Sequence, residues 1–440
     1  MNNKKWMAIL LGGIMAASLA APCSVSAAEK TTLTFWHAMG GTNGEVLQQI
    51  VDDFNASQDE IEIKAEYQGT YDDTITKLKA AMQSDSGLPD VCQMYDVGTK
   101  FMYDSGAVIP VEDKFESTGY DKSSVMEVIS SYYTVDGKQY AMPFNVSTPM
   151  LYYNKDVFEA AGLDPETPPT TYDEVLEDAK KIVESGAAPV GYSQAIYGWF
   201  FEQQLAGLGV TYGNNDNGRT EAVTAVDFDS NGGGLKVFDM WKKLYDSGYF
   251  EDYGTTTADT QTAFFSGQVG MFIESTVILK NAVDSSPFEV GTGYLPRIEQ
   301  NDEGGVIIGG GSLWLTDTGN EANEDAAWKF IEYITTPDVQ AKWSMGTGYF
   351  AINEKAYETD DMKAYLKENP NFETAINQLK DSPVNCNTAG VLSGVQTEAR
   401  LTFNEIMPQV YDGKLTTQDA VDQLAASVNK AIENYNESIK

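Results

Sequence analysis

Groups that perform catalysis are scarce in this sequence of 440 residues. His37 is the only histidine, so a catalytic triad with a histidine base would have to use that residue. The sequence contains neither a G-x-S-x-G motif, which presents a nucleophilic serine, nor a G-x-x-x-x-G-K loop, which binds phosphates. We therefore expect no catalytic residue of these classes.

Carboxylates are abundant and leave one catalytic arrangement open. Two carboxylates that flank a cleft can cleave a glycosidic bond, and Asp96 and Glu274 are candidates for such a pair. An acidic chain also supplies many such pairs by chance. A carbohydrate-cleaving enzyme is kept as an alternative, together with an exported protein that adheres to polysaccharide through an open aromatic surface.

The patterns for metal ligation are incomplete. Asp227, Asp229 and Asn231 begin like a calcium-binding loop, but its twelfth position, which requires a bidentate glutamate, is Phe238. The few cysteines and the single histidine form no cluster with the spacing of zinc ligands. The sequence therefore predicts neither a metal site nor a cofactor.

The amino terminus has the pattern of a secretory signal. Two lysines precede an apolar stretch over residues 6–21, and a run of small residues ends at Ala27. We expect residues 1–27 to be a signal peptide that is cleaved near Ala27, and the protein to be exported to the periplasm or the cell surface. Lipid attachment at Cys23 is the less favoured alternative because a proline directly precedes that cysteine.

Size and charge limit the fold and the partners. Cleavage after residue 27 leaves 413 residues, too many for one hydrophobic core, so we expect two domains. Loss of the two lysines takes the formal charge from −36 to −38, and such a surface repels nucleic acid and anionic lipid. Cys92 lies in an apolar run and is expected to be a buried thiol, whereas a disulfide with Cys386 cannot be deduced from two scattered residues.

Strand-like and helix-like segments alternate along most of the chain, and this order predicts an α/β fold with parallel strands. Helices dominate from residue 321 onward, with breaks at glycine and proline. The expected strands lie near residues 33–36, 61–67, 90–95, 189–193, 268–273 and 307–315, and expected helices lie near 46–54, 71–82, 171–185, 232–247 and 257–266.

The run from Phe144 to Glu174 carries the most specific pattern. An apolar strand leads into a Tyr-Tyr-Asn turn, followed by a short helix that ends in glycine and a proline-rich loop. Thr171 and Glu174 then have the spacing of a capping box at the start of a new helix. This order resembles the point at which family 1 extracellular solute-binding proteins pass from their first lobe to their second.

Further segments resemble the same family and cover nearly all of the chain after the signal in the same order. They are Phe35-Trp36-His37, Gly69-Thr70-Tyr71, Tyr95-Asp96-Val97-Gly98, residues 270–275, residues 307–314 and Thr347-Gly348-Tyr349. The sequence is therefore identified as similar to the maltose-binding-like group of this family, whose members serve ABC importers.

The resemblance implies a two-lobed periplasmic-binding-protein-like fold, with hinged lobes and a central ligand cleft. The first lobe would comprise residues 28–144 and 277–312, and the second residues 147–273 and 315–440. The protein would be a monomer without enzymatic activity that captures a sugar, a polyol or a glycerol-phosphate compound. It would deliver this solute to the permease subunits of an ABC transporter.

The resemblance also implies a set of ligand-binding residues, each of which has a chemical rationale. A tyrosine at a helix start places a phenol beside free amides, and a carboxylate or a serine hydroxyl bonds ligand hydroxyls. Glycine lets a ligand approach the backbone, and a second tyrosine can stack or donate. The expected ligand-binding residues are Tyr71, Asp96, Ser147, Ser275, Gly310 and Tyr349.

Each of these residues also has an ordinary structural interpretation. Asp96, which replaces the glutamate of the family, would then be a solvated loop acid, and the two serines would cap turns. Gly310 would only allow the strand to kink, and the tyrosines would pack at helix ends. Residues 197–201 include four aromatic side chains that would suit sugar stacking, although such spacing is more typical of a core.

One position departs from the family and bears on the charge of the ligand. Counting back from Gly413 places the family's phosphate-pairing arginine at Leu392, which cannot neutralise a phosphate. Either helix amides and serines hold the phosphate, or the ligand is a neutral sugar or polyol, which the loss of the arginine slightly favours. The chain has three arginines: Arg219, Arg297 and Arg400.

Overall fold

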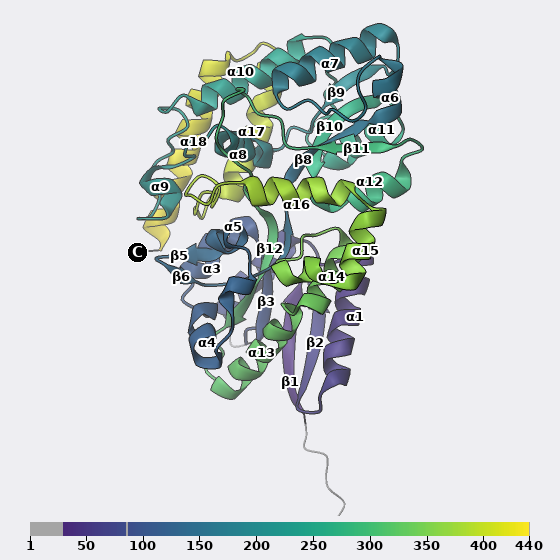
Figure 1. The fold of residues 1–440 in the computed structure, drawn as a ribbon. Helices are drawn as coiled ribbons and strands as arrows, with labels where there is room; N and C mark the ends of the chain where they lie inside the picture. The colour runs from purple at the N-terminus through teal and green to yellow at the C-terminus, as the bar shows by residue number, and fades with distance from the viewer. Residues whose placement is uncertain (1–29, 85–86, 440) are drawn as a thin grey trace, which may run out of the picture.

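The computed structural model describes residues 30–84 and 87–439, and two β-sheets organise this part of the chain (Figure 1). The expected signal peptide and Cys23 lie outside the described residues. The first sheet contains β1 (Thr31–His37), β2 (Ile61–Tyr67), β3 (Val91–Tyr95), β4 (Val108–Ile109), β7 (Met142–Ser147) and β12 (Gly309–Thr316). The second contains β8 (Pro149–Asn154), β9 (Val190–Ser193), β10 (Val269–Ser275) and β11 (Val290–Gly293).

Both sheets are mixed, which differs from the parallel arrangement that the sequence predicts. In the first sheet β1 pairs in parallel with β2 and β3, whereas β12 runs antiparallel to β3, β4 and β7. In the second sheet β8 runs antiparallel to β10 and β11, and only β9 is parallel to β10. The strands β8 and β12, which take part in these antiparallel pairs, each follow a segment that crosses between the sheets.

Helices flank each sheet, and a short β5–β6 pair (Thr134–Val135 and Lys138–Gln139) lies beside the first. The helices on the first-sheet side are α1 (Gly41–Ser57), α2 (Tyr71–Met82), α3 (Thr99–Asp104), α4 (Val111–Thr118), α5 (Glu127–Ser130), α13 (Glu321–Ile334), α14 (Pro337–Thr347) and α15 (Asp360–Glu368). Those on the second-sheet side are α6 (Lys155–Ala160), α7 (Tyr172–Ser185), α8 (Gly198–Gly207), α9 (Asn214–Gly218), α10 (Gly233–Asp246), α11 (Thr257–Phe265), α12 (Leu279–Ser285), α16 (Asn371–Asp381), α17 (Gln396–Tyr411) and α18 (Thr417–Ser438).

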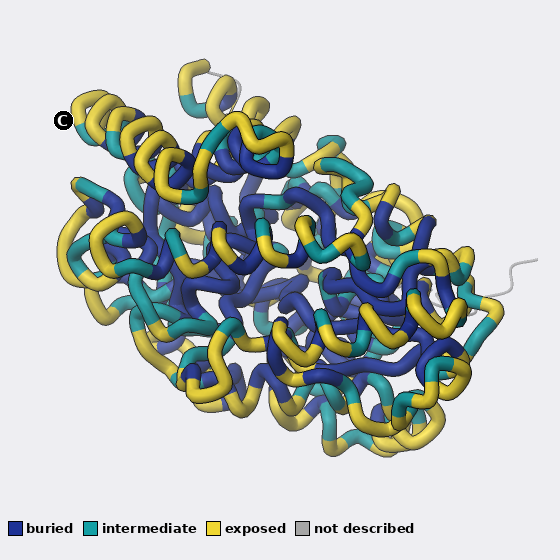
Figure 2. The backbone as a smooth tube through the Cα atoms, turned by 90° about the horizontal axis from the view of Figure 1, so that it is seen from above, coloured by how far each residue is buried: buried dark blue, intermediate teal, exposed yellow. Residues whose placement is uncertain are grey.

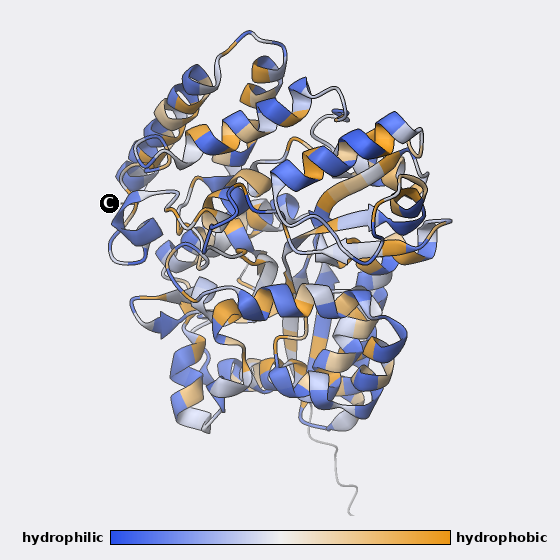
Figure 3. Cartoon of the chain, turned by 45° about the horizontal axis from the view of Figure 1, so that its top comes forward, coloured by the Kyte–Doolittle hydropathy of each residue, from blue (hydrophilic) through white to orange (hydrophobic). Residues whose placement is uncertain are grey.

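Apolar spacing explains how these helices pack. On α7 the buried residues Tyr172, Val175, Ala179 and Ile182 recur every three or four positions, so one stripe of the helix faces the core. The same alternation of apolar and polar residues around the helix axes is visible in Figure 3. Buried segments fill the interior, and exposed residues lie on the outer turns of the helices (Figure 2).

The chain passes between the two sheets at three places, and these passages define two lobes. It crosses from β7 to β8 at Thr148, returns between β11 and β12, and crosses again between α15 and α16. We use "first lobe" for residues 30–147 and 309–368, and "second lobe" for residues 149–293 and 371–439.

The structure differs from the expected lobe boundaries at two places. Residues 277–293 were expected in the first lobe, but β11 pairs with β8 in the second sheet. Helices α13 and α14 were expected in the second lobe, but α13 packs on β1 and β12, and α14 packs on α1. The reason is that β12 extends through residues 309–316 as an inner strand of the first sheet and carries the following helices with it.

Polar contacts join the lobes at one edge. The guanidinium of Arg219, in the second lobe, donates to the carbonyl oxygen of Tyr132 in the first lobe at 2.9 Å. Near the carboxyl end of α18, the hydroxyl of Tyr435 donates to Asp104 at 2.7 Å. Because Arg219 bonds only to carbonyl oxygens, burial lowers its pKa to about 10.

The predicted capping box at the start of α7 is confirmed. The amide of Glu174 donates to the hydroxyl of Thr171 at 3.2 Å, and the amide of Thr171 donates to the Glu174 carboxylate at 3.1 Å. We predict that Thr171→Ala lowers the free energy of unfolding by about 1 kcal/mol because one helix amide loses its acceptor. Urea unfolding followed by circular dichroism measures this change.

Thr262→Ala is the matched control, since Thr262 is exposed in the interior of α11. Alanine is the better helix former at such a position, so stability should stay the same or rise slightly. Equal losses in the two variants would contradict a specific role for the cap.

Candidate functional site

A cleft of about 680 Å³ lies between the lobes, and side chains from both lobes line it. The structure brings all six residues that the sequence singled out to this one cleft. The six are Tyr71, Asp96, Ser147, Ser275, Gly310 and Tyr349. Two other hollows of about 470 and 890 Å³, which lie near Arg297 and Arg219, contain none of the six.

Tyr71 is held by a helix start and by a second aromatic ring. It is the first residue of α2, whose amino end is closed by a capping box between Thr70 and Asp73. Its ring stacks on Tyr95 with centroids 5.1 Å apart, and its hydroxyl accepts a hydrogen bond from the side-chain amide of Asn145 at 2.6 Å. Burial raises the pKa of Tyr71 well above its usual value, so the phenol stays protonated and can donate to a ligand.

Tyr349 reaches the cleft from the carboxyl end of α14. Gly348 ends that helix in a left-handed conformation, with φ of 83°, and turns the chain toward the cleft. The Tyr349 ring stacks on Trp343, with centroids 5.8 Å apart and nearly parallel planes. Tyr71 and Tyr349 therefore both border the first-lobe wall of the cleft.

Gly310 is required by the backbone of β12. Its φ is 97°, and a β-carbon at this position would overlap the carbonyl oxygen of Asn145 on the neighbouring strand. The strand pairing also shifts register between Gly311 and Ser312. The structural role of this glycine is therefore established, and its backbone also borders the cleft.

The two serines lie where strands end at the lobe boundary. Ser147 is the last residue of β7 and Ser275 the last of β10, and the amide of Thr276 donates to the carbonyl of Thr148 at 2.8 Å. The hydroxyl of Ser275 also accepts from the amide of Val277 at 3.4 Å, which is a long capping bond. Ser147 and Ser275 therefore both line the cleft, close to Thr148, where the chain crosses between the lobes.

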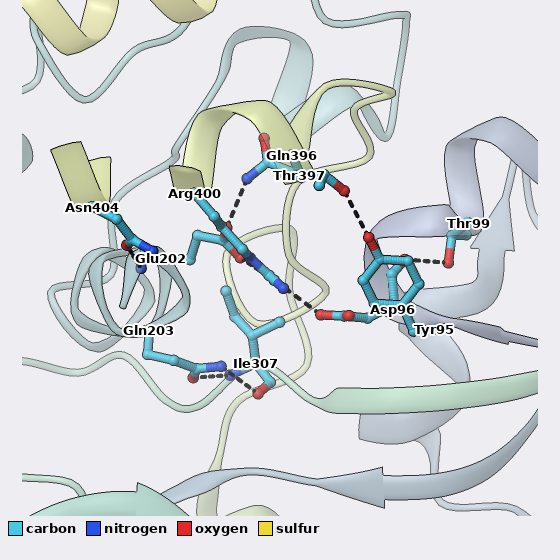
Figure 4. Close-up of polar contacts among 11 residues, drawn as sticks. Tyr95, Asp96, Thr99, Glu202, Gln203, Ile307, Gln396, Thr397, Arg400 and Asn404 are labelled. Atoms are coloured by element: carbon cyan, nitrogen blue, oxygen red, sulfur yellow. Dashed lines mark hydrogen bonds and ion pairs between the residues drawn. The ribbon is translucent and has the colours of Figure 1, made fainter. Parts of the chain in front are cut away.

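The strongest electrostatic interaction in the cleft joins the two lobes (Figure 4). Asp96 follows β3 in the first lobe and accepts a hydrogen bond from Nη2 of Arg400, on α17 of the second lobe, at 2.9 Å. Arg400 also donates to both oxygens of Glu202 on α8, from Nε at 2.8 Å and from Nη2 at 2.7 Å. All three side chains are at least nine-tenths buried.

Burial and pairing oppose each other in this cluster. Burial alone would lower the pKa of Arg400, but Asp96 and Glu202 together raise it well above the usual value. Burial is the largest influence on Glu202 and leaves its pKa raised, although Arg400 acts to lower it. The guanidinium is thus fixed in its charged form between two carboxylates, and Glu202 sets its orientation through a two-point contact.

The structure corrects the expectation at Leu392. Leu392 is buried in the second lobe beside Gly218, and its amide donates to the carbonyl of Asn217 at 2.8 Å. It precedes α17 and does not line the cleft, whereas Arg400 does. The cleft therefore contains the guanidinium of Arg400, which was not predicted when the family's arginine was placed by counting back from Gly413.

A pattern in the sequence does indicate that Arg400 belongs to a polar face of its helix. Gln396, Arg400 and Asn404 recur every four residues and place polar groups along one face of α17 (Figure 4). Gln396 donates to Glu202 at 2.9 Å, and Asn404 accepts from the amide of Gly198 at 2.9 Å. This polar row faces α8, and its middle member, Arg400, lines the cleft.

Of the four aromatic residues at positions 197–201, two are placed where they could stack on a sugar and two belong to the core. Tyr197 and Trp199 line the cleft, whereas Phe200 and Phe201 are fully buried in the core of the second lobe. Burial, together with the nearby carboxylates of Asp96, Glu202 and Glu274, raises the pKa of Tyr197 to about 12 despite the opposing effect of Arg400.

Other groups that might carry chemistry lie elsewhere. His37 is buried against Phe35 and Tyr67, outside the cleft lining, and burial lowers its pKa to about 4. Cys92 and Cys386 are both free. Within residues 30–84 and 87–439, no three acidic, cysteine or histidine side chains are grouped as metal ligands would be. No helix in the same ranges is both long and apolar enough to span a bilayer.

Comparison with known proteins agrees with this geometry. Residues 49–374 match the family of bacterial extracellular solute-binding proteins. The chain belongs to this family. It is 31% identical over 417 residues to the sn-glycerol-3-phosphate-binding periplasmic protein UgpB of Escherichia coli K12, a match that covers 93% of this chain and 94% of the relative.

Solved structures of solute-binding proteins have the same fold. The UgpB structure from Mycobacterium tuberculosis, in complex with glycerophosphocholine, has a TM-score of 0.78 and is 20% identical, covering 93% of this chain and 100% of the other. The cyclic α-maltosyl-1,6-maltose binding protein of Arthrobacter globiformis has a TM-score of 0.77 and is 25% identical, covering 92% and 100%. The family resemblance and the two-lobed fold expected from the sequence are confirmed.

The buried ion cluster generates a stability prediction. Arg400→Gln leaves Asp96 and Glu202 buried without a cation, so this solute-binding protein should lose about 3–5 kcal/mol of unfolding free energy at pH 7. The loss should be smaller at pH 5, because Glu202, whose pKa is raised by burial, takes up a proton in the folded state as the pH falls. Urea unfolding at the two pH values measures both effects.

Arg297→Gln is the control. Arg297 is exposed, and its side chain has no hydrogen bond or ion pair to any described residue, so its replacement should change stability by less than about 0.5 kcal/mol. A loss in Arg400→Gln that matches the control, or that grows at pH 5, would contradict the buried charge cluster.

Proposed function

We propose that this protein is the substrate-binding subunit of an ABC importer and that it captures a small hydroxyl-rich solute between its lobes. The observation that carries the proposal is the convergence of six residues from both lobes on one cleft. Closure of two lobes about such a cleft brings the hydrogen-bonding groups of both onto one ligand.

The ligand class rests on the side chains in the cleft and on the relatives. Phenols, serine hydroxyls and carboxylates bond hydroxyl groups, and the rings of Tyr197 and Trp199 suit the face of a sugar or polyol. Family members with similar sequence or fold are named for sn-glycerol 3-phosphate and for a cyclic maltosaccharide, and one was solved with glycerophosphocholine. Each of these ligands carries at least two hydroxyl groups.

Export, delivery and the monomeric state complete the proposal. The amino-terminal signal pattern and the periplasmic relatives support secretion, and the family role supports delivery of the closed, loaded form to membrane permease subunits. We infer that the protein acts as a monomer and catalyses no reaction.

One feature supports the carbohydrate-cleaving alternative, since Asp96 and Glu274 line the same cleft. Asp96, however, is bound to Arg400 and so is poorly placed to act as a nucleophile or base. Calorimetry with sugars, polyols, glycerol 3-phosphate and glycerophosphodiesters should find a bound solute that is recovered unchanged. Hydrolysis products in the same samples would favour the enzyme.

Loss of one cleft hydroxyl should weaken binding measurably. Ser275→Ala should reduce the affinity for the solute by about 1–3 kcal/mol, which corresponds to about 5- to 150-fold in Kd, as expected for a buried hydrogen bond. Isothermal titration calorimetry on the purified mature protein measures the change.

Ser266→Ala is the matched control, because the hydroxyl of Ser266 bonds the carbonyl of Ala263 at the end of α11, outside the cleft lining. Its affinity should equal that of the unaltered protein. An unchanged Kd in Ser275→Ala would place the solute elsewhere.

A further inference from the structure

Glu274 is a buried carboxylate without a positive partner. It lies near the end of β10, lines the second-lobe side of the cleft and is 4% exposed. One oxygen accepts from Nε2 of Gln261 at 3.0 Å and the other from the amide of Ser275 at 2.7 Å. No lysine or arginine among the described residues forms an ion pair with it. Burial raises its pKa, which reflects the cost of keeping this charge away from water.

The charges around the cleft do not balance. The charged residues that line it are Asp72, Asp96, Glu274 and Arg400. The single guanidinium is already shared between Asp96 and Glu202, so it offers no compensation to Glu274. A solute that brings a positive group to the Glu274 side would remove this imbalance.

Two aromatic side chains of the same cleft offer a surface that a cation prefers. Tyr197 and Trp199 line the cleft with ring centroids 6.0 Å apart, and the pKa of Tyr197 responds to the charge of Glu274. Aromatic faces attract ammonium groups, and tryptophan does so most strongly.

We propose that Glu274, Tyr197 and Trp199 form a subsite for a positively charged group, so that the preferred solute is a hydroxyl-rich compound that carries an ammonium group. The inference rests on the proposed solute-binding function. The hydroxyl part of the solute contacts Ser275 and the first-lobe residues, and the ammonium group lies against the carboxylate of Glu274 and the two rings. Amino sugars and the choline or ethanolamine esters of glycerol phosphate share this chemistry.

Matched ligand pairs test the subsite. Calorimetry on the mature protein compares glycerophosphocholine and glycerophosphoethanolamine with sn-glycerol 3-phosphate, and glucosamine with glucose. In at least one of these comparisons the ammonium compound should bind about tenfold more tightly or better. The comparison that shows the preference identifies the source of the ammonium group.

Glu274→Gln removes the charge and keeps the shape. In this variant the preferred ammonium compound should lose about tenfold or more in affinity, whereas its partner without the cation should change by less than about threefold or bind more tightly. Asp259→Asn is the control, because Asp259 is exposed on α11, the helix that carries Gln261, and does not line the cleft. It should leave both affinities unchanged.

The outcomes separate this inference from the proposed function. Tight binding of a solute without any preference for its ammonium analogue, in the unaltered protein, overturns the subsite and leaves the solute-binding function standing. Equal losses for both members of a pair in Glu274→Gln overturn it as well. If no compound of any pair binds, and a wider panel of sugars and polyols also fails, the proposed function itself is overturned. The ligand comparisons in the unaltered protein can refute the subsite by themselves. The proposal therefore stays testable even if the Glu274→Gln variant fails to fold.

Discussion

The ion cluster of Asp96, Arg400 and Glu202 is the interaction on which the geometry of the cleft depends. It joins a strand end of the first lobe to two helices of the second through one guanidinium. Buried charges are costly, so such a cluster is stable only when every member keeps its partners. Relative movement of the lobes must therefore break or exchange the contact between Asp96 and Arg400, whereas the contact between Glu202 and Arg400 moves with the second lobe.

Backbone constraints hold the floor of the cleft in place. Gly310 has a positive φ and Asn145 lies directly against it, so a side chain does not fit there, and the side-chain amide of Asn145 in turn donates to the hydroxyl of Tyr71. A strand distortion in β12 thus fixes a candidate ligand-binding tyrosine that is more than 200 positions away in the sequence. The glycine and the tyrosine are parts of one arrangement, although they belong to different elements.

Local signals allowed much of the fold to be predicted from the sequence. The capping box at Thr171, the helix expected near residues 171–185 and the strand that ends before Asp96 depend on neighbouring residues, and all three are present. The lobe boundaries and the mixed strand directions were missed because they depend on pairing between distant segments, such as β12 with β3. Arg400 was missed for a related reason, since counting residues ignores which face of α17 turns toward α8.

The six residues that the resemblance singled out all line one cleft, but the resemblance could not reveal how they are connected. That Asp96 would be tied to an arginine of the opposite lobe follows only from the tertiary structure. The same holds for Glu274, which has no characteristic neighbours in the sequence and becomes informative only once its burial and its missing cation are known.

The contacts at the lobe edge, from Arg219 to Tyr132 and from Tyr435 to Asp104, have a thermodynamic consequence. They consist only of protein groups and lie away from the cleft lining, so they contribute to the free energy of the compact arrangement whatever the solute is. The apparent affinity of a two-state receptor equals its intrinsic affinity multiplied by the fraction already competent to bind. Substitutions at this edge would therefore scale the affinities for all solutes by one common factor and leave their ranking intact.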